Sequence, residues 1–264
     1  MRDQRNSSIR IKKRARGREA HPKRDGSPVL YGWHTVKAAL ENPQRRIRRL
    51  FATENAARRL AEEGVPLRAE LELVRPEMIA RRLSPDAVHN GLLAEADPLP
   101  SLELDEIEAG DLMLVLDQIT DPHNVGAILR TAAAFDVAAV VTTARHSPQA
   151  SGVLAKSASG ALEYVPLITV QNLARGIEQL RERGFLVIGL DSSGEDDLAG
   201  AAVRTPLALI LGAEGKGLRQ LTRASCDCLA RLDLPGRIKS LNVSNAAALA
   251  LYIARKRLAE SARS

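Results

Sequence analysis

The second half of the chain contains four short, continuous apolar runs. They are LMLVL, AAVVT, LVIGL and LALIL, at residues 112–116, 138–142, 186–190 and 207–211. Runs of this length without polar alternation are typical of parallel strands that are buried on both faces of a sheet. Amphipathic segments at about 122–135, 171–183 and 240–258 predict helices between or after these strands. The pattern therefore predicts an α/β domain with a parallel sheet over residues 110–264.

Shorter elements alternate in the first part of the chain. Helices are predicted at 34–41, 56–63 and 76–83, and strands at 48–53, 71–74 and 92–96. This alternation predicts a small α/β module over residues 29–96. The following segment, DPLPSLELDEIEAG, contains two prolines and five acidic residues, so residues 97–109 are predicted to be a linker.

The positive charge of the chain lies at its start. Residues 1–27 contain ten basic and three acidic residues, which gives that segment a charge of +7, whereas the whole chain carries +6. Residues 1–28 are therefore predicted to be a basic, disordered tail that binds a polyanion. A solvated tail without a partner is the alternative.

Composition narrows the class of protein. No stretch approaches about 18 consecutive apolar residues, so no membrane span is expected. The basic start lacks an apolar region that a secretory signal would need. An arginine-rich start is also found in mitochondrial transit peptides, but the low serine content favours a cytoplasmic protein of bacterial type. Cys226 and Cys228 cannot form a four-ligand zinc site by themselves, and no metal is expected.

The first of three polar clusters is TDPHNVGAILR, residues 120–130. Asp121 is a suitable N-cap, and Pro122 suits the first helical position. The amides at such a helix start favour an anionic ligand. Asn124 and Arg130 add further polar groups, and Gly126 leaves room for a close approach. An ordinary capped helix with a solvated arginine is the alternative.

The second cluster is LGAEGKGL, residues 211–218. Glycines at 212, 215 and 217 after a strand suggest a backbone that wraps closely around a ligand. The sequence matches neither a P-loop nor a dinucleotide fingerprint. Glu214 in this loop is expected to cap a helix or to contact a ligand.

The third cluster is LDLPGRIKSLNVSNAA, residues 232–247, before the helical pattern ALALYIARKRL. Pro235 and Gly236 interrupt the chain. Four polar side chains then crowd one helix start, although one would satisfy the cap. They are Ser240, Asn242, Ser244 and Asn245.

In this order, the three clusters resemble the three motifs of the SpoU/TrmH family of SPOUT methyltransferases. The resemblance extends from Val29 to about Leu258 and includes LYGWHTVKAAL, AVHNGLLA and VPLITVQNLAR outside the motifs. One departure concerns the local shape of the cofactor loop rather than its presence. Family members usually have Pro-Met where this chain has Asp233 and Leu234, and the proline of this chain is Pro235.

The resemblance implies a trefoil-knotted parallel-sheet domain at the C-terminus, after a small α/β RNA-binding domain. It also implies a homodimer that uses S-adenosyl-L-methionine and binds structured RNA. The implied cofactor contacts, mainly from the backbone, are Leu211, Gly212, Gly217, Leu232, Leu234 and Leu241. The implied catalytic residues are Asn124, Arg130, Glu214, Ser240 and Asn242.

The matches outside the motifs favour 2′-O-methylation of a ribose, expected to be that of a guanosine, in 23S rRNA. Methylation of tRNA, an rRNA methyltransferase that confers antibiotic resistance, and a non-catalytic ribosome assembly factor are the alternatives. Guanidinium is a poor base because it has no acceptor and a pKa above about 12. We therefore expect Arg130 to clamp a phosphate and stabilise the developing oxyanion, while a phosphate oxygen or water takes the proton.

Overall fold

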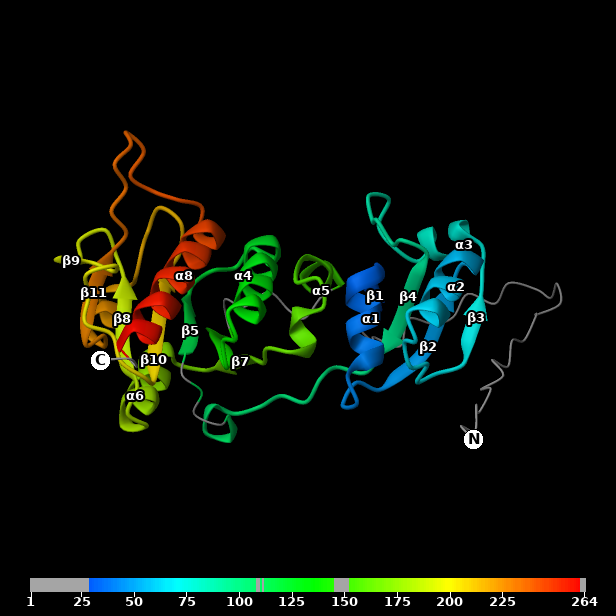
Figure 1. Ribbon diagram of the computed structural model, residues 1–264, viewed down its shortest axis with the longest axis horizontal. Coiled ribbons are helices and arrows are strands. Elements are labelled where there is room, and N and C mark those ends of the chain that lie inside the picture. Colours follow the sequence, from blue (N-terminus) through cyan, green and yellow to red (C-terminus); the bar gives the residue numbers. More distant parts are fainter. Residues whose placement is uncertain (1–28, 108–109, 111, 145–151, 262–264) are drawn as a thin grey trace. The chain divides into compact units, whose positions relative to one another are not determined.

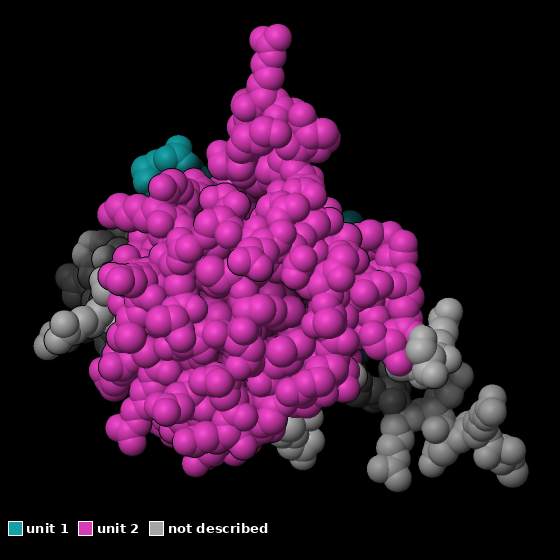
Figure 2. Space-filling view, turned by 90° about the vertical axis from the view of Figure 1, so that its left-hand side faces the viewer, with its two compact units in different colours: residues 1–99 teal, residues 100–264 magenta. Residues whose placement is uncertain are grey.

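The computed structural model describes residues 29–107, 110, 112–144 and 152–261, which divide after Leu99 into two compact units (Figures 1 and 2). The predicted basic tail lies outside the described residues. Each unit has its own sheet, as the alternation of elements predicts.

The smaller unit is a four-stranded sheet in the order β1-β4-β2-β3, in which only the pair β2–β3 is parallel. Its strands are β1 (Val29–Tyr31), β2 (Ile47–Ala52), β3 (Leu71–Leu73) and β4 (Leu92–Ala96). Its helices are α1 (Trp33–Glu41), α2 (Glu54–Glu62) and α3 (Pro76–Ala80). Phe51 is buried between Ile79 and Leu93. The guanidinium groups of Arg49 and Arg82 lie 4.6 and 4.2 Å from the centre of its ring, a distance at which cation–π attraction stabilises the pair.

The larger unit contains a seven-stranded, entirely parallel sheet in the order β7-β6-β5-β10-β8-β11-β9. Its central strands are β5 (Leu112–Asp117), β6 (Ala139–Thr143), β8 (Leu186–Leu190) and β10 (Leu207–Gly212). The outer strands are β7 (Leu167–Val170), β11 (Cys228–Arg231) and β9 (Asp196–Asp197). The predicted α/β class with a parallel sheet is confirmed, whereas the knot stays a prediction.

Helices cover both faces of this sheet (Figure 1). On one face lie α4 (Pro122–Ala134), α5 (Gly152–Ser157), α8 (Val243–Ser261) and the 3₁₀ turn η2 (Ala161–Glu163). On the other lie α6 (Leu173–Glu182), α7 (Gln220–Ala224) and the 3₁₀ turn η1 (Leu104–Glu106). Leu114 packs toward the first group and Val115 toward the second, because successive side chains of a strand point to opposite faces.

The second half of the predicted linker is packed rather than free. Leu104 and Ile107 are buried in the core beneath α6, and their carbonyl oxygens accept hydrogen bonds from Arg183. This segment therefore belongs to the larger unit from Pro100 onward.

Candidate active site

The first cluster begins helix α4, at the carboxyl end of β5. Asp121 is the N-cap, and its carboxylate accepts a hydrogen bond of 2.9 Å from the amide of His123. Pro122 occupies the first turn, where its missing N–H costs nothing. Asn124 is then half-buried on the first turn, so the local sequence fixes its position.

Glu214 joins the three sequence clusters at one carboxylate oxygen. Its Oε1 accepts hydrogen bonds from Asn124 Nδ2 at 3.2 Å, from Asn242 Nδ2 at 2.7 Å and from the amide of Val243 at 3.0 Å. Asn242 Nδ2 also lies 3.1 Å from Asn124 Oδ1. Three of the five residues predicted to be catalytic therefore form one hydrogen-bonded group, although 90 or more positions separate Asn124 from the other two.

Asn242 also caps helix α8. Its Oδ1 accepts from the amide and the hydroxyl of Ser244 at 2.9 and 2.6 Å. The helix consequently begins at Val243, rather than at the predicted residue 240. Ser240 is exposed in the preceding loop, and the described contacts do not join it to Asn124 or Glu214.

The second cluster forms a tight turn after β10. Gly215 and Gly217 have φ angles of +74° and +64°, which favour glycine. A Cβ on Gly212 would lie 2.2 Å from the carbonyl carbon of Gly217. Gly212 is thus needed because the loop folds back onto it. This packing requires glycine whether or not a ligand is bound. The side chain of Leu211 is buried in the core, so only its backbone is available to a ligand.

The third cluster forms an extended loop between β11 and α8. Every residue from Pro235 to Asn242 is exposed, and the loop projects from the larger unit (Figures 1 and 2). Leu232 packs against the core, Leu234 is half-buried, and Leu241 is 38% exposed. The bond between Asn242 and Glu214 ties the end of this loop to the turn after β10.

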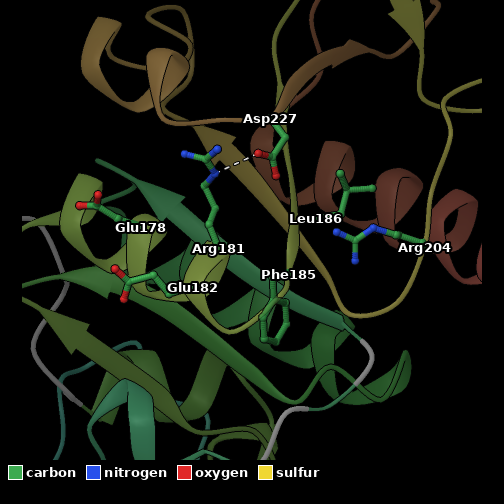
Figure 3. Close-up of a pocket in the computed structure, with 7 residues that line it drawn as sticks. All are labelled: Glu178, Arg181, Glu182, Phe185, Leu186, Arg204 and Asp227. Carbon is green, nitrogen blue, oxygen red and sulfur yellow. Dashed lines mark hydrogen bonds and ion pairs between the residues drawn. The ribbon is translucent and has the colours of Figure 1, made fainter.

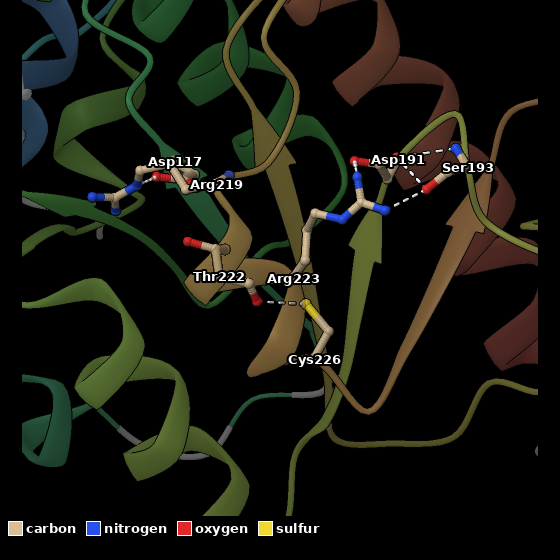
Figure 4. A network of polar contacts seen from close by, with 7 residues as sticks. All are labelled: Asp117, Asp191, Ser193, Arg219, Thr222, Arg223 and Cys226. Carbon is tan, nitrogen blue, oxygen red and sulfur yellow. Dashed lines mark hydrogen bonds and ion pairs between the residues drawn. The ribbon is translucent and has the colours of Figure 1, made fainter.

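Two buried carboxylates bind the residues that follow the turn after β10, and the sequence analysis predicted neither of them (Figure 4). Asp117, whose side chain is 0% exposed, accepts from Nε of Arg219 at 2.6 Å and from its amide at 3.0 Å. Asp191 binds Arg223 Nη1 at 3.1 Å and both donors of Ser193. Each aspartate comes directly after a buried apolar strand or ends one, and that placement was the available signal.

We expect Asp191 to make stability depend on pH. Burial alone would raise the pKa of Asp191, but hydrogen bonds from Ser193 and Leu218 and the charge of Arg223 hold the pKa below its ordinary value of 3.8. A lowered folded pKa stabilises the protein above about pH 4, and this contribution disappears as pH falls through the folded value. Asp191→Asn should lower the free energy of unfolding by about 1–3 kcal/mol at pH 7 and should show a shallower loss in acid.

Urea unfolding at several pH values between 3 and 7 measures both effects. Glu178→Gln, an exposed carboxylate on α6, is the matched control and should follow the wild type. If the free energy of unfolding falls equally steeply with decreasing pH in the wild type and in Asp191→Asn, the assignment is contradicted.

Arg130 and Gly126 occupy other positions on α4. Arg130 is exposed and shows no contact with Asn124, Glu214 or Asn242 among the described residues. It follows Asn124 by six residues, or about 9 Å along the helix, on a different side. Gly126 is buried, and a Cβ there would lie 2.3 Å from that of Ser157. The close approach at Gly126 is therefore that of helix α5.

None of the five predicted catalytic residues lines either of two cavities in the described part of the larger unit. One, of about 440 Å³, is shown in Figure 3 and lies where β8 begins, near Arg181, Phe185 and Asp227. Asp227 is occupied there by structural bonds to Arg181 Nε at 2.9 Å and to the amide of Val187 at 2.8 Å. The other, of about 450 Å³, lies beside Arg219. The described residues contain no group of three potential metal ligands and no helix able to cross a membrane.

Comparisons with known sequences agree with the geometry. Residues 111–252 match the SpoU rRNA methylase family, and residues 29–102 match the substrate-binding domain of RNA 2′-O-ribose methyltransferases. The chain is 39% identical over 234 residues to the 23S rRNA (guanosine-2′-O-)-methyltransferase RlmB of Pseudomonas putida, covering 84% of this chain and 94% of that protein. It is 41% identical to RlmB of Ralstonia nicotianae, covering 86% and 94%.

Solved structures show the same fold over both units. A TrmH-family RNA methyltransferase described as putative, from Porphyromonas gingivalis, is 27% identical with a TM-score of 0.75, covering 89% of this chain and 91% of that one. AviRb from Streptomyces viridochromogenes, in complex with AdoMet, is 24% identical with a TM-score of 0.74, covering 89% and 91%. A family match over more than half of the chain and relatives near 40% identity agree with the three motifs, and the chain belongs to the SpoU rRNA methylase family.

Proposed function

We propose that this protein transfers a methyl group from S-adenosyl-L-methionine to the ribose 2′-hydroxyl of a guanosine in 23S rRNA. The hydrogen-bonded group of Asn124, Glu214 and Asn242 carries the proposal, because it unites the three family motifs at one place. The RlmB relatives are named for this reaction and match both units of the chain. Acting on rRNA places the protein in the cytoplasm under the same proposal.

The residues present fit the cofactor. The bond between Glu214 and Asn242 brings the turn after β10 and the loop after β11 to one place. Backbone groups of Gly212 and Gly217 and apolar side chains of that loop suit a ligand that is partly apolar and partly polar. In this proposal the contacts also include the backbone of Leu211 and the residues Leu232, Leu234 and Leu241. When bound, S-adenosyl-L-methionine supplies the electrophilic methyl group.

The chain's own residues position the RNA and stabilise charge. Glu214 accepts three N–H donors and holds the amide side chains of Asn124 and Asn242 in fixed orientations. Arg130, with its planar fork of donors, would bind the phosphate next to the target ribose and stabilise negative charge on the 2′-oxygen. Ser240 lies on the exposed loop, where its hydroxyl would meet the RNA.

We also propose a homodimer formed through the layer of α4, α5 and α8. Four large apolar side chains on this face of the unit are 37–64% exposed: Val153, Tyr164, Leu249 and Tyr252. Burying them against a second copy would remove apolar surface from water. Arg130, exposed on the same layer and separate from Asn124, would then complete the site of the other subunit.

Mapping of 2′-O-methyl groups in cellular RNA, with and without the gene, tests the activity. We expect one guanosine of 23S rRNA to lose its 2′-O-methyl group when the gene is deleted and to regain it with the wild-type gene. Loss of a tRNA modification instead would favour the tRNA alternative. An unchanged map, together with failure of the purified protein to bind S-adenosyl-L-methionine in calorimetry, would favour a non-catalytic assembly factor.

A further inference from the structure

The cavity of about 450 Å³ beside Arg219 lies at the carboxyl ends of β6 and β7, against helices α6 and α7. Its volume is within the range of about 300–1,000 Å³ that is typical of small-ligand sites. The residues that line it lie between the first two motifs or directly after the second: Thr143, Gln171, Asn172, Leu173, Ala174, Arg219, Leu221 and Thr222. None of them has a role in the proposed reaction.

Thr222 gives the cavity a polar side chain. The residue is 1% exposed and lines the cavity. Its carbonyl oxygen accepts a hydrogen bond from Cys226 Sγ at 3.2 Å. In Figure 4 the hydroxyl points away from Cys226, to the side on which the Arg219 side chain extends.

Arg219 gives the cavity hydrogen-bond donors in fixed positions, and its positive charge is balanced by Asp117. Its Nε and its amide both bind Asp117, which fixes the guanidinium in place. The two terminal nitrogens make no contact with described residues, so they remain available as donors. Because the buried carboxylate balances the charge of Arg219, and no other charged side chain lines the cavity, the site suits a neutral ligand better than a free phosphate.

The rest of the lining combines apolar walls with amide groups. Leu173, Ala174 and Leu221 are apolar, and Leu221 is 65% exposed. Gln171 is exposed, while Asn172 uses its Oδ1 to cap the ten-residue helix α6 at the amide of Arg175, 3.2 Å away. Apolar walls with donors and acceptors at the rim match a flat heteroaromatic ring, whose faces are apolar and whose edges bear donors and acceptors.

We propose that this cavity binds one unpaired base of the substrate RNA. The proposal rests on the proposed function, which supplies the RNA. The base would lie against Leu221, with an edge toward the terminal nitrogens of Arg219 and the hydroxyl of Thr222. Sequence-specific recognition of RNA commonly uses such unstacked bases in loops and bulges. Free nucleosides have the same chemistry, so the experiment must separate the two sources.

The test combines protein variants with abasic RNA. Wild-type protein is first shown to methylate a fragment of 23S rRNA, which tests the proposed function independently. Single abasic sites are then introduced at each unpaired position, and dissociation constants are measured by fluorescence anisotropy. Thr222→Val should raise the dissociation constant of the intact RNA about 3- to 10-fold, as expected for one lost hydrogen bond. Leu221→Ala should have a similar effect, about 5-fold, because stacking contributes to base binding.

The deciding measurement is whether the protein substitution and the abasic site change the dissociation constant independently of each other. At one unpaired position, removing the base should weaken wild-type binding but should have no further effect on Thr222→Val or Leu221→Ala. Ser225→Ala is the matched control, since this residue at the end of α7 does not line the cavity and its hydroxyl bonds to the carbonyl of Leu221 at 2.9 Å, and it should behave as wild type. Additive effects at every position overturn the proposal, as does binding of free nucleosides that depends on Thr222 and does not compete with RNA. If Thr222→Val fails to fold, the exposed Leu221→Ala decides alone.

Discussion

Replacing Arg130 by alanine is expected to lower the single-turnover methylation rate about 100- to 1,000-fold, as for loss of one preorganised charged donor. The affinity for S-adenosyl-L-methionine should stay near that of the wild type. Arg130 is exposed on α4 and separate from the turn after β10, so its removal leaves the cofactor loops intact. A donor that acts mainly in the transition state changes turnover more than binding. Methylation of an rRNA fragment and cofactor calorimetry measure the two quantities.

Two controls separate the role of Arg130 from a general loss of positive charge. Lys256→Ala removes an exposed charge from α8 and should leave turnover unchanged. Arg130→Lys keeps the charge but loses the planar fork, so we expect partial activity over a broad pH range. If the lysine variant is active only at high pH, where its amine is neutral, a role as base gains support and the charged clamp is contradicted. Full turnover by Arg130→Ala would show that the catalytic centre lies elsewhere.

The proposed dimer allows a sharper form of this experiment. Arg130→Ala and Asn242→Ala should each be nearly inactive, because each removes part of the site. If Arg130 serves the neighbouring subunit, a mixed dimer contains one site with both residues intact. Unfolding and refolding the two variants together should then restore about a quarter of wild-type activity, as random pairing in a symmetric dimer requires. Absence of recovery in dimers shown to be mixed would place Arg130 in the site of its own chain.

Replacing Gly212 by alanine should weaken S-adenosyl-L-methionine binding about 10-fold or more and lower stability by about 2–3 kcal/mol, as overpacking does. The added Cβ would lie 2.2 Å from the carbonyl carbon of Gly217 and 2.5 Å from the amide of Leu218. Backbone atoms cannot rotate away as a flexible side chain can, so the whole turn must move. That turn carries Glu214, so Asn124 and Asn242 would lose their common partner.

Gly236→Ala is the matched control, because a Cβ there meets nothing within 4 Å and its φ is not in the left-handed region. It should leave both stability and affinity unchanged. Calorimetry and thermal unfolding provide the measurements. Normal cofactor affinity in Gly212→Ala would contradict the proposed cofactor loop.

The hydrophobic pattern predicted the centre of the larger sheet better than its margins. Strands β5, β8 and β10 lie within one residue of the predicted runs, because strands buried on both faces need continuous apolar sequence. Strands β7 and β11 were not predicted. Both are four residues long and only partly buried, so few of their positions require apolar residues. Helix α8 starts after the predicted residue because Asn242 is its N-cap. The hydrophobic pattern could not show which of the four polar residues would be the cap.

The motifs predicted which residues lie together, but not the hydrogen bonds between them. Asn124, Glu214 and Asn242 were expected at one site, and they meet there. Two glycines have neighbours that the motifs did not specify, since helix α5 packs on Gly126 and the turn after β10 folds back onto Gly212. The support from Asp117 and Asp191 was missed because a single acid at a strand end has no distinctive pattern. The position of Arg130 relative to a second copy cannot follow from spacing within one chain.

The order in which the site is assembled has a consequence during synthesis. Asn124 bonds to residues 90 and 118 positions later in the chain, and the pair Asp117–Arg219 spans 102 positions. Such distant pairings form slowly, because the ends of a long loop must meet before any contact is gained. A nascent chain therefore has no complete site until Asn242, which directly precedes the last helix, has left the ribosomal tunnel. A chain still being translated cannot act on its own ribosome, and a premature stop before residue 242 yields a protein without the hydrogen-bonded group of Asn124, Glu214 and Asn242.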